Sequence, residues 1–120
     1  MHVNAEIKLI YSLDIDDLDN YSPDDPDCFG FNLRLIAGPK GQPGEESFDI
    51  QVCTPQWLLS RFAREEVIVG RHFLIVFEYN FSRIRAKIEK SCERCTGETW
   101  NEVALKLSRL GYWESEDYQG

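Results

Sequence analysis

The fold of this chain is decided by two stretches, Phe29-Gly-Phe-Asn-Leu-Arg-Leu-Ile-Ala37 and Ser47-Phe-Asp-Ile-Gln-Val-Cys53. Apolar side chains recur at every second position in both, at residues 29, 31, 33 and 35 and again at 48, 50 and 52. A period of two is typical of strands with one buried face. The Gly/Pro-rich turn over residues 38–44 joins them, so we predict an antiparallel hairpin.

Three helices are expected after this hairpin. Thr54-Pro55 is a helix start, with Thr as N-cap and Pro at the first position, and this helix is expected to end near Glu65. Asn80 can cap a second helix with an apolar face of Phe81, Ile84, Ile88 and Cys92. A third should run from about Glu98 to Leu110, where Thr99 and Glu102 can form a capping box. Its predicted buried stripe is Trp100, Val103, Ala104, Leu107 and Leu110.

Two further strands complete the expected fold. Ala5–Ser12 alternates like the hairpin, whereas His72–Tyr79 is nearly all apolar and is predicted to be a strand buried on both faces. Residues 112–118 are expected to be extended or irregular. The order of elements predicts a single α+β domain over residues 1–120, with a mostly antiparallel sheet of about four strands and three helices packed on one face.

The charge of the chain is concentrated in one loop. The formal net charge is −8, and seven aspartates without any basic residue lie between the first two predicted strands: Asp14, Asp16, Asp17, Asp19, Asp24, Asp25 and Asp27. Burying unpaired carboxylates is too costly for this segment to be a core element. It must be solvated, bind a cation, or meet a basic partner. An EF-hand is a poor fit, because the carboxylate spacing is wrong and no central Gly follows.

A basic protein is the expected partner if the loop binds one. Opposite fields accelerate association, whereas nucleic acid and anionic membranes require clustered Lys and Arg. Tyr21 could supply an aromatic anchor. The C-terminal residues Trp113, Glu114, Glu116, Asp117 and Tyr118 repeat the combination of aromatic rings and carboxylates, so they are candidates for the same surface. The alternative is that Trp113 and Tyr118 fill the edge of the core.

The sequence offers little for catalysis or metal binding. Cys92 and Cys95 have the spacing of a ligand pair, but the only other Cys and His residues are Cys28, Cys53, His2 and His72. Two alternative functions stay open: an adaptor domain stabilised by zinc at Cys92 and Cys95, and a general protein-interaction domain. The chain lacks known nucleophile and phosphate-binding motifs. We expect no enzyme activity and no cofactor.

No membrane span or signal peptide is visible, so we expect a cytoplasmic protein with free thiols. The sequence leaves the oligomeric state open.

Several blocks resemble the immunity-8 family of bacterial polymorphic toxin systems. They are Phe48-Asp-Ile-Gln-Val-Cys-Thr-Pro-x-Trp-Leu58, Gly70-Arg-His-Phe-Leu-Ile-Val-Phe-Glu-Tyr79 and Gly97-Glu-Thr-Trp-Asn-Glu-Val-Ala-Leu-Lys-Leu-Ser-Arg109 with the following Trp113-Glu114 and Glu116-Asp-Tyr118. Pro26-Asp27 and Phe29-Gly-Phe31 also fit. The resemblance implies a small cytosolic α+β protein, without catalytic residues, that binds and neutralises the C-terminal domain of a cognate toxin, possibly a nuclease.

Overall fold

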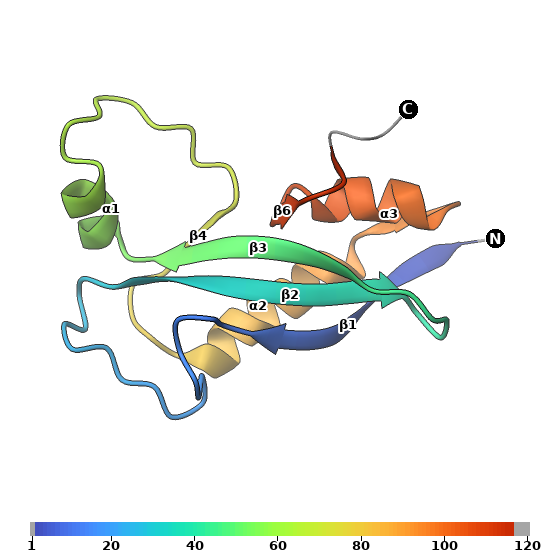
Figure 1. The fold of residues 1–120 in the computed structure, drawn as a ribbon, viewed down its shortest axis with the longest axis horizontal. Coiled ribbons are helices and arrows are strands. Elements are labelled where there is room, and N and C mark those ends of the chain that lie inside the picture. Colours follow the sequence, from blue (N-terminus) through green and yellow to red (C-terminus); the bar gives the residue numbers. More distant parts are fainter. Residues whose placement is uncertain (1, 117–120) are drawn as a thin grey trace.

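The computed structural model describes residues 2–116 and contains one six-stranded mixed sheet with three helices (Figure 1). The strands are β1 (Val3–Tyr11), β2 (Gly30–Pro39), β3 (Glu46–Cys53), β4 (Phe73–Ile75), β5 (Thr96–Gly97) and β6 (Tyr112–Trp113). The helices are α1 (Pro55–Arg61), α2 (Phe81–Glu93) and α3 (Trp100–Leu107). The strand order is β4-β3-β2-β1-β5, and β6 also pairs with β3. The α+β class is confirmed.

The β2–β3 hairpin forms the centre of the core, as its alternating pattern predicted. The two strands pair antiparallel with Leu33 opposite Ile50 and Leu35 opposite Phe48. The apolar side chains of one face are buried, namely Phe31, Leu33, Leu35, Ala37, Phe48, Ile50 and Val52. The opposite face is more open and carries an ion pair between Arg34 and Asp49 at 2.7 Å. Period-two alternation therefore separated the two faces correctly.

Helices α2 and α3 cover the buried face of the sheet. The predicted α2 stripe is buried, and so are Val103, Ala104 and Leu107 of α3. All three N-caps act as expected: the side-chain oxygens of Thr54, Asn80 and Thr99 accept backbone N–H groups of the first turns. Glu102 accepts from the N–H of Glu98 at 2.8 Å, one residue before its expected capping-box partner.

The first helix lies at the end of the sheet, beyond β3, and buries none of its residues (Figure 1). It is held by the Trp57 ring, which lies so close to Gly30 that a Cβ there would be 2.3 Å from it. Thr54 adds a second attachment, because its backbone N–H donates to the Phe29 carbonyl at 3.0 Å. The helix ends at Arg61, earlier than predicted.

Two expectations about the sheet are wrong. Over residues 2–116 it has six strands rather than about four, although it is mostly antiparallel as expected and differs only in the parallel pairing of β4 with β3. The predicted strand over residues 72–79 is reduced to Phe73–Ile75 at the sheet edge, and Phe77 is 81% exposed. The strand stops after Ile75 because its parallel register places Val76 beyond Cys53, the last residue of β3, and the chain continues there into α1 at Pro55. An apolar run does not show by itself how many of its faces are covered.

Candidate partner-binding site

The acidic segment, residues 14–27, is the irregular connection between β1 and β2 and lies beside the end of the sheet (Figure 1). All seven of its aspartates are exposed. Two apolar residues within it point the other way, since Ile15 is 8% and Leu18 is 9% exposed. The segment is therefore attached to the core by its apolar side chains and presents its carboxylates to solvent.

Aromatic contacts fix the middle of the acidic segment. The Tyr21 ring packs edge-on against Phe31, with centroids 6.0 Å apart, and against Tyr79 at 5.0 Å. The Tyr79 hydroxyl donates a hydrogen bond to the Leu18 carbonyl. Burial raises the pKa of Tyr79 to about 12, and the charges of Asp19 and Asp17 add to this shift. Sequence reasoning missed Tyr79, because its partner Leu18 is 61 residues away.

Three of the aspartates hold the segment in shape. Asp14 Oδ2 accepts from the backbone N–H of Asn32 at 2.7 Å, which extends the β1–β2 pairing. Asp17 accepts from the backbone and side-chain N–H groups of Asn20, and the side-chain hydrogen bond holds the pKa of Asp17 below its usual value. Asp25 Oδ1 accepts from the Asp27 N–H at 2.9 Å. The bonds of Asp17 and Asp25 are typical of turns stabilised by Asp side chains.

The other four aspartates are Asp16, Asp19, Asp24 and Asp27. Within residues 2–116 their carboxylates accept no hydrogen bond and pair with no Lys or Arg. These carboxylates are consequently the ones available to a partner.

The C-terminal candidates lie elsewhere. β6 pairs with Phe48 and Asp49, whereas the acidic segment joins β2 at Gly30, which is opposite Cys53 at the other end of β3 (Figure 1). Glu114 is exposed. Hydrogen bonds from Ser108 and Arg71 hold the pKa of Glu116 below its usual value, and Arg71 forms an ion pair with it. Asp117 and Tyr118 lie outside the described residues.

Trp113 has the core role that the sequence left open. It is 3% exposed, and its ring lies 6.1 Å from that of Phe48. Its indole N–H donates to Glu46 Oε1 at 3.0 Å, while Trp100 donates to Oε2 of the same carboxylate at 2.5 Å. Trp113 is therefore not on the surface that a partner would meet.

The cysteines are free thiols and are not assembled into a site. Cys53 and Cys92 are buried, and burial raises the pKa of Cys92 to about 12. Cys95 Sγ donates to the Ser91 carbonyl at 3.3 Å. The part of the chain that is described holds no group of three or more His, Cys, Asp or Glu residues that could bind a metal ion. His72 is used structurally, with Nε2 2.7 Å from the Ser108 carbonyl.

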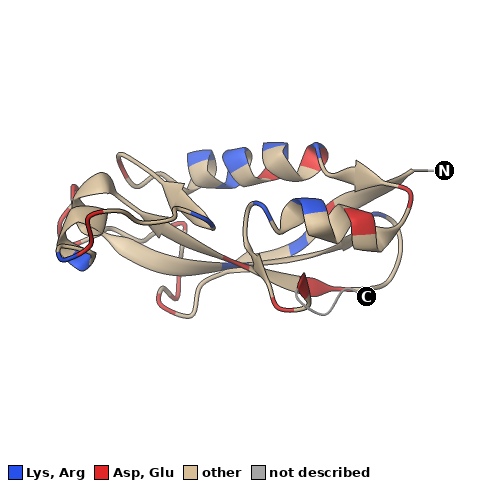
Figure 2. Cartoon of the chain, turned by 90° about the horizontal axis from the view of Figure 1, so that it is seen from above, with Lys and Arg blue, Asp and Glu red and all other residues tan. Residues whose placement is uncertain are grey.

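A basic face on α2 is a feature that the sequence reasoning did not find. Its exposed cations are Arg83, Arg85, Lys87, Lys90 and Arg94, the last one the C-cap. Figure 2 shows Lys and Arg along this helix and Asp and Glu mainly on loops. Residues 61–120 have no net charge, because their acidic and basic residues are equal in number. The net charge of this half therefore gave no indication that several cations gather on one helix. Helical spacing around the apolar stripe could have revealed it.

These features define a class of protein: an α+β domain with an ordered loop that is packed on the core and exposes its aspartates. The family model described as Immunity protein 8 matches residues 5–118, and the chain belongs to this family. Neither the search of curated proteins nor that of solved structures found a match. Among the described residues, no helix is long and apolar enough to cross a membrane.

Proposed function

We propose that this chain is a cytoplasmic immunity protein that binds and neutralises the C-terminal domain of a cognate bacterial toxin, without catalysis. The acidic segment is the proposed contact surface. The observation that carries this proposal is the outward display of its unpaired aspartates on a segment that the core holds in place. Family membership supports the role of inhibitor.

A basic toxin face is the expected complement. A nuclease needs cationic side chains where it holds phosphate, and an inhibitor that presents fixed carboxylates there can imitate the substrate's charge. Opposite charges would raise the association rate and make it dependent on salt. Inhibitor complexes of this kind can reach nanomolar dissociation constants, about −12 kcal/mol.

Growth rescue tests the function directly. Cells expressing the C-terminal domain of the toxin encoded next to this gene should stop growing, and coexpression of this chain should restore growth. The purified pair should bind more weakly as salt is raised. No rescue and no binding would refute the proposed function.

Charge-neutral variants test the contact surface. Replacing Asp16, Asp19, Asp24 and Asp27 together with Asn removes four charges that hold no part of the fold, so the melting temperature should hardly change. Association should slow at least tenfold at low salt. The matched control replaces four exposed acids elsewhere, Glu45, Glu66, Glu93 and Glu98, with Gln and changes the net charge equally. Equal effects of the two variants would show that net charge, not this surface, governs binding.

A further inference from the structure

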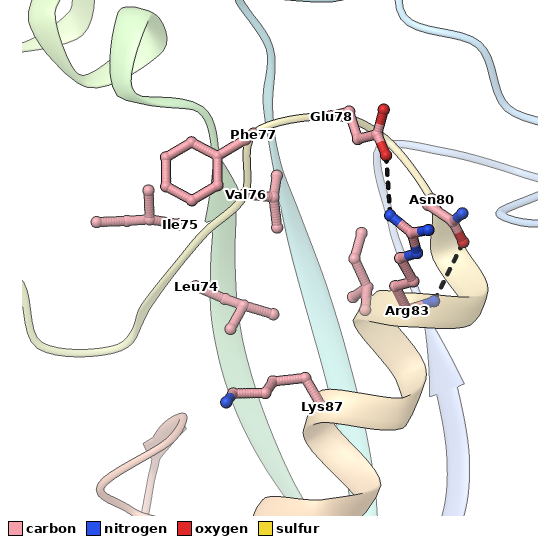
Figure 3. A pocket seen from close by; sticks show the side chains of 9 residues that line it. Leu74, Ile75, Val76, Phe77, Glu78, Asn80, Arg83 and Lys87 are labelled. Atoms are coloured by element: carbon pink, nitrogen blue, oxygen red, sulfur yellow. Dashed lines mark hydrogen bonds and ion pairs between the residues drawn. The ribbon is translucent and has the colours of Figure 1, made fainter.

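An apolar groove lies between the β4 strand and α2 (Figure 3). Its volume is about 430 Å³. Leu74, Val76 and Ile84 line the side toward the helix, and Ile75 and Phe77 contribute the exposed side chains of its rim. A phenyl ring that is 81% exposed is a large apolar group to leave in water, and such groups often mark interaction sites.

The groove lies close to the acidic segment, because Tyr79 stands between groove residues in the chain and contacts that segment. Tyr79 follows Phe77 by two residues, and its hydroxyl and ring contact Leu18 and Tyr21. Leu18 lies between Asp17 and Asp19 in the sequence. A partner that covers these carboxylates therefore comes within reach of Phe77 without any rearrangement of the chain.

Charges of opposite sign flank the groove. Arg83 and Lys87 line its helix side, whereas the exposed carboxylates of the acidic segment lie outside the lining, beyond Tyr79. Glu78 Oε1 accepts from Arg83 at 3.1 Å and so occupies that guanidinium (Figure 3). Lys87 makes no ion pair within residues 2–116. A partner that complements this part of the surface would therefore place a basic group opposite the acidic segment, an apolar group opposite the groove and a carboxylate opposite Lys87.

We propose that the groove receives one apolar side chain of the toxin, on a segment whose basic residues face the acidic segment and whose carboxylate faces Lys87. This inference rests on the proposed function and names the apolar anchor of the same interface. Buried apolar contacts at the centre of an interface dominate its affinity, while charges around them mainly govern association. A second copy of this chain is a poorer occupant, because it would bring another net charge of −8 to this surface.

Binding of the purified toxin C-terminal domain to Phe77→Ala tests the inference. Phe77 contributes little to the core, so the variant should fold with an unchanged melting temperature. Its dissociation constant should rise about 30-fold or more, chiefly through faster dissociation, with an unchanged salt dependence. Leu105→Ala, which removes an apolar side chain exposed on α3, is the matched control and should bind like the wild type. Lys87→Glu should weaken binding severalfold, and most at low salt.

The outcomes separate this inference from the proposed function. If the wild type binds and rescues growth but Phe77→Ala binds equally well, the groove is not the anchor and the immunity function stands. If the wild type binds no toxin, both proposals fail. Self-association of the wild type that Phe77→Ala abolishes would assign the groove to a second copy of this chain and overturn the inference.

Discussion

Replacing Glu46 with alanine should destabilise the fold far more than a partly exposed glutamate normally would. The Glu46 carboxylate accepts the indole N–H groups of Trp100 and Trp113, on α3 and β6, and so connects both to β3. Trp113 is 3% exposed, so its N–H would be left without a partner. An orphaned buried donor costs about 2 kcal/mol. Trp100 is only half-buried and water can reach it, so its lost bond should cost about 1 kcal/mol.

The expected loss for Glu46→Ala is therefore about 3 kcal/mol in the free energy of unfolding. For a domain of this size, that corresponds to a fall of about 12 °C in the melting temperature. Urea unfolding followed by far-ultraviolet circular dichroism measures the loss without depending on tryptophan fluorescence. Glu45→Ala is the matched control: the neighbouring glutamate is exposed, and its loss should stay within about 0.5 kcal/mol.

A double-mutant cycle identifies the source of the effect. Trp113→Phe removes the buried N–H, so Glu46→Ala should cost only about 1 kcal/mol in that background. A cost of about 3 kcal/mol in both backgrounds would show that the Trp113 hydrogen bond is not responsible. If Glu46→Ala in the otherwise unchanged protein proved as stable as Glu45→Ala, the reasoning would be refuted altogether.

Two further predictions concern pH and thiol chemistry. The pKa of Tyr79 is raised to about 12, so between about pH 10 and 12 the unfolded chain loses this proton first and stability falls as pH rises; below pH 10 the contribution is constant. Tyr79→Phe should reduce that decline in urea unfolding, and an identical slope in both proteins would contradict the assignment. Cys53 and Cys92 are buried with raised pKa values, so a disulfide reagent at pH 8 should modify half-exposed Cys28 first and these two only after unfolding. Mass spectrometry of partly labelled protein checks the order, and early labelling of Cys92 would show that the end of α2 opens readily.

Local pattern predicted the elements whose environment repeats along the chain. The β2–β3 hairpin and the apolar stripe of α2 each bury one continuous face, so periodicity alone identifies them. It failed for residues 72–79, because the length of that strand depends on where its distant partner β3 ends, at Cys53 opposite Ile75. The role of Trp113 was undecided for the same reason: Glu46, its partner, is 67 residues away.

For the acidic segment, too, local sequence predicts some properties, while others depend on contacts with distant residues. Its charge predicts exposure, and the exposure of all seven aspartates agrees with that. The sequence does not show which carboxylates are committed to turns, because those hydrogen bonds depend on the path of the loop. Nor does it show that Tyr79 reaches back to Leu18 and fixes this path.

This fixed path bears on how the proposed interface would work. A mobile polyacidic loop would lose conformational freedom on binding, at a cost of about 0.5–1.5 kcal/mol for each side chain that becomes ordered. Here Ile15, Leu18 and Tyr21 already hold the backbone against the core. Most of the conformational entropy of the loop is then already lost during folding, so little more is lost on binding. The carboxylates also keep their spacing in the unbound protein. Tyr79→Phe should therefore weaken toxin binding although Tyr79 itself is only half-exposed, whereas an unchanged affinity would mean that the loop is ordered without this contact.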